Sequence, residues 1–224
     1  MSNSIPVLSV PSAKQLRKSI NNICDSYSHP FDVVTELVQN AVDAIVSYQQ
    51  TFPEGKQHEI QVTIDVHNRR VEVRDTGIGI EKQDLELLLG PHGTLKDNHA
   101  ELIGNKGVGL TYTIFVCNQW QLDTRTVNGS VKGEIEGGRA WKVAAPGYSD
   151  EPLFELLEET DRGNKAEETG TTISVTGIEQ YPDLESDLFS QSKEALKFLL
   201  RTRTAIGCTK EEPENIRVFC LHRR

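Results

Sequence analysis

Three polar residues, Glu36, Asn40 and Asp43, have the spacing of a single helix face. The stretch 36–44 contains no Gly or Pro. Apolar residues recur through it at helical spacing, namely Val34, Leu37, Val38, Ala41, Val42 and Ile45. At about 100° per residue, positions i, i+4 and i+7 fall on one line. Because a buried, unpaired carboxylate is costly, this line predicts a ligand, a metal ion or water against the helix. A solvated face with chance spacing is the alternative.

A second group of chemically useful residues is Asp75-Thr76-Gly77-Ile78-Gly79-Ile80, at the end of an expected strand. Alternating glycines indicate a backbone that turns sharply and lets another group come close. The Asp75 carboxylate could accept a hydrogen bond from an exocyclic amine such as that of adenine. Ile78 and Ile80 could supply apolar contact for a base. An ordinary Asp-Gly turn is the alternative.

A third group is the glycine-rich turn Gly104-Asn105-Lys106-Gly107-Val108-Gly109-Leu110, which opens an expected helix. Backbone N–H groups at a helix N-terminus bind phosphate readily, and Lys106 adds a positive charge. The pattern is not a Rossmann fingerprint, because no strand enters it, and not a Walker A loop, because no GK[ST] follows. The polar residues 91–103 before it have the character of a lid.

Helices and strands must position these groups. We expect helices at 13–27, ending at His29-Pro30, through the central stretch to about residue 50, at 81–90, after Gly109 and at 183–204. We expect strands at 59–65, 71–75, 120–127, 130–135, 139–144, 153–157, 170–177 and 215–221. Turns are expected at Asn68-Arg69, Asn128-Gly129 and Gly137-Gly138, and an exposed loop at 161–168.

Composition excludes several classes of protein. The chain has 224 residues, 37% of them hydrophobic, which fits a globular domain. Its net charge of −9 argues against direct nucleic-acid or anionic-membrane binding. No apolar run has the length of a membrane span, and there is no signal-peptide core. The four cysteines, Cys24, Cys117, Cys208 and Cys220, have no zinc spacing, and reduced thiols in a cytoplasmic protein are expected.

Taken in order, the three groups and Gly170-Thr171 resemble the GHKL ATPases, which include gyrase B, Hsp90-type chaperones, sensor histidine kinases and MutL. MORC proteins carry a related domain, which would imply a nuclear location in a eukaryote. The stretch from Gly93 to Gly109 is most similar to the Hsp90 lid. The resemblance covers about residues 13–180 and implies a Bergerat fold, an α/β sandwich with helices on one face of a mixed, mainly antiparallel sheet. We expect a single domain over 1–224, with 181–224 as a C-terminal helix and strand that could begin a following domain.

The resemblance also implies roles for particular residues. Glu36 would be the general base that activates water, Asn40 would bind Mg²⁺, and Asp43 would order the polar helix face. Asp75 would read the adenine amine with support from Thr171. The implied nucleotide-binding set is Asn40, Asp43, Ala44, Asp75, Gly77, Ile78, Gly79, Ile80, Thr94, Lys96, Gly104, Asn105, Lys106, Gly107, Val108, Gly109, Leu110 and Thr171.

Three functions are compatible with this set. The first is a Mg²⁺-dependent ATPase switch, in which ATP closes the lid and promotes a homodimer or partner contact and hydrolysis to ADP releases it. The second is a kinase catalytic module acting on another chain, although histidine kinases usually lack the Asp43-Ala44 ending. The third is a non-hydrolysing ATP sensor. Related hydrolases draw a catalytic Lys or Gln from a following domain, so we expect a module of a longer protein or a subunit that needs a partner.

Overall fold

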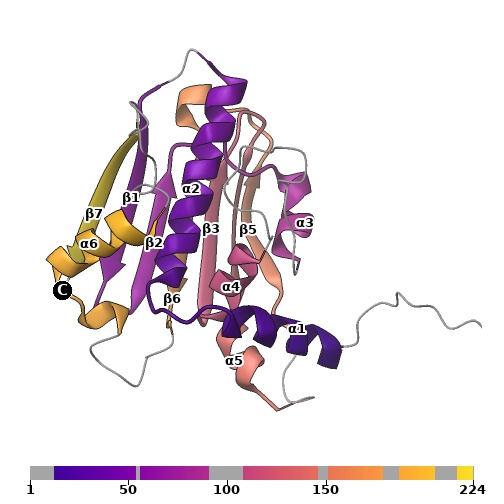
Figure 1. The fold of residues 1–224 in the computed structure, drawn as a ribbon. Helices are drawn as coiled ribbons and strands as arrows, with labels where there is room; N and C mark the ends of the chain where they lie inside the picture. The colour runs from indigo at the N-terminus through magenta and orange to yellow at the C-terminus, as the bar shows by residue number, and fades with distance from the viewer. Residues whose placement is uncertain are drawn as a thin grey trace, which may run out of the picture.

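The computed structural model describes residues 13–53, 56–90, 108–145, 151–178, 187–204 and 216–223. Its centre is a seven-stranded sheet with the order β5-β4-β3-β6-β2-β1-β7 (Figure 1). The strands are β1 (His58–Asp65), β2 (Arg70–Asp75), β3 (Gln119–Arg125), β4 (Ser130–Glu136), β5 (Phe154–Thr160), β6 (Gly170–Thr176) and β7 (Ile216–Arg223). Every neighbouring pair is antiparallel except β1 and β7, which are parallel. The expected mixed, mainly antiparallel sheet is confirmed.

The helices lie on one face of this sheet, which makes the two-layer sandwich that was expected (Figure 1). They are α1 (Ala13–Asp25), α2 (Asp32–Thr51), α3 (Leu85–Leu89), α4 (Gly109–Phe115), α5 (Gly138–Val143) and α6 (Lys193–Arg203). Single 3₁₀ turns occur at η1 (Lys82–Asp84), η3 (Ala166–Glu168) and η4 (Leu188–Ser190). The long helix α2 crosses the sheet and contacts β1, β2, β6 and α4, so it is the element on which the other layers are arranged.

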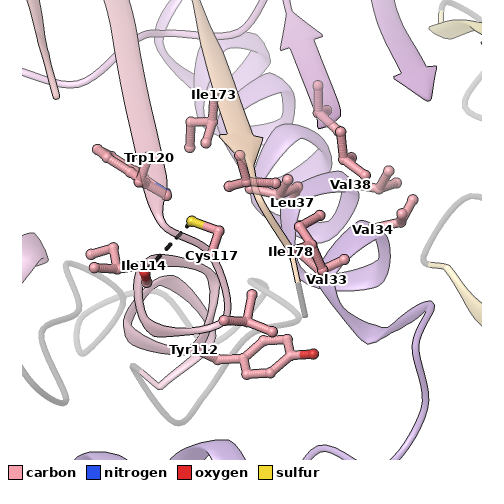
Figure 2. Close-up of a cluster of buried hydrophobic side chains, with 14 of the residues drawn as sticks. Val33, Val34, Leu37, Val38, Tyr112, Ile114, Cys117, Trp120, Ile173 and Ile178 are labelled. Atoms are coloured by element: carbon pink, nitrogen blue, oxygen red, sulfur yellow. Dashed lines mark hydrogen bonds between the residues drawn. The ribbon is translucent and has the colours of Figure 1, made fainter. Parts of the chain in front are cut away.

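The core lies between α2 and the inner face of the sheet. Alternate residues of β1, namely Ile60, Val62 and Ile64, have no exposed surface, as the period of two along a strand predicts. From α2, Val33, Val34, Leu37 and Val38 are buried, with Leu37 on the side of Ile173 of β6 and Val33 beside Ile178 (Figure 2). Burying such a side chain contributes about 1.5–3 kcal/mol. This packing fixes the rotation of α2 and therefore the direction in which its polar residues point.

Strand β6 occupies the middle of the sheet although it comes late in the chain. It pairs with β2 on one side and with β3 on the other, and Ile173 is opposite both Val73 and Leu122. Because both pairings are antiparallel, β6 begins at the edge of the sheet where β2 ends. Thr171 is thereby placed beside the strand-end residue Asp75.

The expected strand at 139–144 is wrong, because the segment forms α5. Gly137 adopts the left-handed conformation (φ 73°) and ends β4, after which the chain turns into a helix. The helix buries Trp141, whose ring packs against Phe115 at 5.5 Å between centroids. The guanidinium of Arg17 covers the same ring at 4.4 Å. A six-residue segment is too short for its apolar period to distinguish a helix from a strand.

The expected helix at 183–204 begins later than predicted. Residues 183–186 lie outside the described part of the chain, and Leu188–Ser190 form only a 3₁₀ turn. Helix α6 starts at Lys193, where the Ser192 hydroxyl caps it by accepting from the Ala195 N–H at 3.1 Å. The other expected helices and strands are present with small shifts of their ends, and η3 lies within the loop expected at 161–168. The proposed lid at 91–103 lies outside the described residues.

Candidate nucleotide site

Helix α2 carries the first group of polar residues on one face. It begins after Pro30, where the His29 N–H donates to the Asp32 carboxylate at 2.9 Å. Asp43 is buried at 4% exposure, whereas Glu36 and Asn40 are half-buried. The Asn40 side chain makes no hydrogen bond with the described residues. The arrangement therefore leaves a polar amide at a partly open position of a packed helix.

The turn after β2 rests directly on α2. The Ile78 N–H donates to the Ala44 carbonyl at 3.1 Å, in addition to the hydrogen bonds within the helix. A Cβ atom on Gly77 would lie 2.6 Å from the Ala44 carbonyl carbon and 2.7 Å from its Cβ. This close approach requires a glycine at position 77 and a small residue at position 44. The Asp43-Ala44 end of the first group thus packs directly against the glycine turn that follows Asp75.

The second glycine of this turn is required for a different reason. Gly79 has φ +82°, a conformation that side chains rarely adopt, and it lies against the Arg125 carbonyl at the end of β3. The next N–H, that of Ile80, donates to the Thr124 hydroxyl at 2.8 Å. The Thr124 and Thr171 hydroxyls are 3.2 Å apart. The turn is therefore fixed at both ends, to α2 and to the central strands.

Asp75 lies at the centre of this construction. It is 7% exposed, and its Oδ1 accepts hydrogen bonds from the Gly77 N–H at 2.8 Å and the Thr171 N–H at 3.3 Å. Burial raises the pKa of this carboxyl to about 7, and the two N–H groups and the Lys56 charge act in the opposite direction. Oδ2 accepts no hydrogen bond from the described residues. One oxygen is held by the protein, and the other retains its capacity for a ligand's donor.

Lys56 supports the turn after Asp75 indirectly, by binding the segment that precedes β6. Its ammonium donates to the carbonyls of Ala166, Glu167 and Thr169 at 3.1–3.2 Å. The Thr169 hydroxyl donates to the Gly77 carbonyl at 2.7 Å. Burial lowers the Lys56 pKa, while the nearby Asp75 charge raises it. The segment before β6, which the sequence predicts only as an exposed loop, therefore supports the turn after Asp75.

Glu36 contacts the start of α4. Its Oε1 accepts a hydrogen bond from the Tyr27 hydroxyl at 3.1 Å. A Cβ atom on Gly109 would lie 2.8 Å from the Glu36 Cδ, so the carboxyl group occupies the space that a side chain at 109 would need. The described end of the glycine-rich group thus meets the first group on α2. Two residues further along α4, the buried Thr111 hydroxyl has no hydrogen-bond partner among the described residues.

The described parts of all four groups come together in space. The residues placed are Glu36, Asn40, Asp43, Ala44, Asp75, Gly77, Ile78, Gly79, Ile80, Val108, Gly109, Leu110 and Thr171. Thr94, Lys96, Gly104, Asn105, Lys106 and Gly107 lie outside the described residues, so their assignment stays a prediction. Sequence reasoning missed Tyr27, Lys56, Thr124 and Thr169. The last three act across 44 to 113 residues of chain, and Tyr27 lies in the link before α2, where no spacing rule pairs it with Glu36.

Comparison with known proteins agrees with the geometry. Residues 26–177 match the family model described as "Histidine kinase-, DNA gyrase B-, and HSP90-like ATPase". This chain belongs to that family. As the resemblance in the sequence implies, it is a GHKL domain of Hsp90-like character. The matched region begins just before Tyr27 and ends just after β6, so it contains every described residue of the site.

Several curated relatives of this GHKL domain share one name, "Chaperone protein HtpG". The protein from Bacillus licheniformis is 28% identical over 224 residues, which cover 88% of this chain and 33% of that protein. The protein from Shouchella clausii is 25% identical over 91% of this chain and 34% of its own length. A Clostridium botulinum protein is 33% identical over 63% of this chain and 24% of its own length. The chain thus spans about a third or less of these relatives.

The donor set of the site bears on which cation it could hold. In the described ranges there is no group of three or more His, Cys, Asp or Glu residues that could enclose a metal ion. Mg²⁺ does not need such a cage, because it usually takes one or two protein oxygens together with phosphate oxygens and water. The open amide of Asn40 fits this requirement. Separately, none of the described helices is long and apolar enough to cross a membrane.

Proposed function

We propose that this GHKL domain binds ATP together with Mg²⁺ and hydrolyses it to ADP and phosphate. The observation that carries the proposal is the Asp75 carboxyl group, which is buried at the end of β2 with only Oδ1 hydrogen-bonded by described residues. A hydrogen-bond acceptor with one committed oxygen at the bottom of a fixed turn suits an exocyclic amine. In this reading, Asp75 accepts from the adenine amine, and Thr171 and Ile80 contact the base.

The phosphate end of the nucleotide lies toward α2 and α4 in this proposal. The segment Gly104–Gly109 supplies backbone N–H groups to the phosphate oxygens, with Lys106 as an added charge. Asn40 holds Mg²⁺, which neutralises phosphate charge when it is bound. Gly109 at the start of α4 and Glu36 on α2 are already adjacent, which supports placing the phosphates at this junction.

Glu36 is the general base. It accepts a proton from a water molecule as the water oxygen bonds to the γ-phosphorus and the bond from that phosphorus to the β–γ bridging oxygen breaks. The leaving electrons stay on ADP, and inorganic phosphate is the second product. Most of the rate acceleration comes from positioning and charge neutralisation, so small displacements of Glu36 should matter.

Nucleotide occupancy drives a conformational switch in this proposal. ATP orders the segment 91–109 over the site and promotes contact with a second copy or a partner protein, and hydrolysis releases it. The relatives are named as chaperones, so a chaperone-type role for a longer assembly is the favoured setting. The same ATP-dependent closure serves other roles in this family, and the fold alone does not choose among them.

The test is to separate binding from chemistry with Glu36→Gln. We expect ATP affinity within a few-fold of the parent and single-turnover hydrolysis reduced on the order of a hundred-fold or more, as for loss of a general base. Glu155→Gln on the exposed edge strand β5 is the matched control and should behave as the parent does. Parental hydrolysis by Glu36→Gln would remove Glu36 from the chemistry. Binding without any hydrolysis by either protein would replace the ATPase with a sensor.

A further inference from the structure

Tyr27 occupies the link between α1 and α2, nine residues before Glu36. Its hydroxyl donates to the Glu36 Oε1 at 3.1 Å. Its ring stacks on Tyr112 of α4, with 3.8 Å between the ring centroids and 15° between the planes. Tyr112 is itself 3% exposed and belongs to the core shown in Figure 2. The phenol is therefore held by a buried ring, and its hydroxyl has a fixed direction.

The Glu36 carboxyl group is confined on its other side by α4. Gly109, the first residue of that helix, has no side chain, and the carboxyl group lies where a Cβ atom would be. Two residues of α4, Gly109 and Tyr112, thus act on one carboxylate of α2, the first directly and the second through Tyr27. Movement of α4 relative to α2 cannot occur without changing the surroundings of Glu36.

Burial and the charges around Tyr27 determine which group is the donor in the hydrogen bond between Tyr27 and Glu36. Burial and the Glu36 charge both raise the pKa of Tyr27, and Asp32 and Cys24 act in the same direction. The phenol therefore stays protonated at any working pH and serves only as a donor toward the carboxylate. A donor of this kind stabilises the ionised form of its acceptor, which is the form that a general base requires.

We propose that Tyr27 is a positioning residue that acts through Glu36, with its hydroxyl orienting the carboxylate and favouring its ionised form. The inference rests on the proposed function, since it takes Glu36 as the base. In this proposal the Tyr27–Tyr112 stack does more than pack, because a movement of α4 would move Tyr27 and so change its hydrogen bond to Glu36. Neither tyrosine contacts the nucleotide in this account.

The first variant is Tyr27→Phe, which deletes the hydroxyl and keeps the stacked ring. We expect ATP affinity to stay within about three-fold, single-turnover hydrolysis to fall about ten-fold, and the acid limb of the pH–rate profile to move roughly half a unit or more to higher pH. Tyr48→Phe is the control. Tyr48 is 2% exposed and lies in the last part of α2, and its hydroxyl makes no hydrogen bond with the described residues, so parental behaviour is expected.

A second variant should shift the pH profile in the opposite direction while keeping both the hydroxyl and the stacked ring. Placing 3,5-difluorotyrosine at position 27 makes the phenol a stronger donor, and the acid limb should then move to lower pH. An unshifted pH profile in both variants, or a loss of ATP affinity and thermal stability without a shift, would show that the hydrogen bond is only structural. Either result overturns the proposal.

Glu36→Gln, measured beside these variants, distinguishes an error in the proposed function from an error in the role given to Tyr27. If it hydrolyses ATP at the parental rate, or if the parent itself has no turnover, the proposed function fails and this inference fails with it. If Glu36→Gln is inactive while Tyr27→Phe matches the parent in rate and pH profile, only the role of Tyr27 is wrong. If both proposals hold, Tyr27→Phe adds no further loss in the Glu36→Gln background.

Discussion

The backbone of Gly77 lies directly on the backbone of Ala44, with no space between them for a methyl group. The Ile78 N–H donates to the Ala44 carbonyl at 3.1 Å, and a Cβ atom on Gly77 would be 2.6–2.8 Å from three atoms of Ala44. This contact joins the helix that carries Glu36 and Asn40 to the turn that holds Asp75. The two halves of the proposed ATP site are therefore positioned relative to each other by one glycine.

Gly77→Ala should push the turn after Asp75 away from α2. Because the obstructing atoms belong to the helix backbone, we expect a cost of about 2 kcal/mol or more, which lowers the midpoint of thermal unfolding by roughly 4–8 °C. ATP affinity measured by calorimetry should fall about ten-fold or more. Gly90→Ala is the control, since its Cβ would make an ordinary contact at 3.4 Å from the Leu87 carbonyl. Equal behaviour of the two variants would contradict the argument.

Asp75 should make adenine binding depend on pH. The pKa of this carboxyl is raised to about 7, and its ionised form is the better acceptor for an amine. Adenosine affinity should therefore increase about three- to ten-fold between pH 6 and pH 8. Adenosine is the suitable probe because it carries no phosphate that titrates in this range. Asp75→Asn should abolish ATP binding. An unchanged ATP affinity in calorimetry would show that Asp75 does not bind the adenine amine.

The same carboxyl group should also affect stability. Its pKa is raised on folding, so the folded state binds the proton more tightly, and the stabilisation present below about pH 4 is lost as the pH rises to 7. Asp75→Asn has no such loss. The melting temperature of Asp75→Asn minus that of the parent should increase from pH 5 to pH 8. A constant difference over this range would show that the carboxyl is not buried as described.

Asn40→Ala should weaken binding and turnover together. The reason is that the Asn40 amide, which has no hydrogen-bond partner among the described residues, is proposed to hold Mg²⁺. The effect should appear with Mg²⁺ and ATP and shrink when EDTA removes the metal, because little remains to be lost. Calorimetry with and without Mg²⁺ measures this difference. If affinity falls equally in both conditions, Asn40 contacts the nucleotide itself.

Lys56→Gln tests whether Lys56 supports the turn after Asp75. The substitution removes the charged donor from the carbonyls of residues 166, 167 and 169. The segment 166–169 is then held less firmly, and with it the Thr169 hydroxyl that donates to the Gly77 carbonyl. We expect ATP affinity to fall several-fold and stability to fall by about 1–2 kcal/mol. Lys132→Gln, on an exposed position of β4, removes the same charge without these contacts and should have little effect. A matching loss in both variants would indicate a general charge effect.

The sequence predicts the parts of this molecule that depend on local pattern. The periodicity of 36–44 predicts α2 and the shared face of Glu36, Asn40 and Asp43, and glycine spacing predicts the turn after Asp75. The pattern fails at α5, where Gly137 and the burial of Trp141 determine the conformation of a short segment. It also cannot find Tyr27 or Lys56, because their functions come from partners on other elements and no spacing rule records such contacts.

The position of β6 has a consequence for how the protein acquires its site. The hairpin β1–β2 and the strands β3, β4 and β5 have no pairing with each other except through β6. Asp75 and the Thr171 N–H that fixes it are separated by 96 residues. A chain that grows from its N-terminus therefore holds two unconnected half-sheets until β6 has emerged, and closing so long a loop is a slow step. On the proposed function, ATP binding can then arise only after β6 has paired with β2 and β3, so ATP binding by a growing chain would indicate that the central strand is in place.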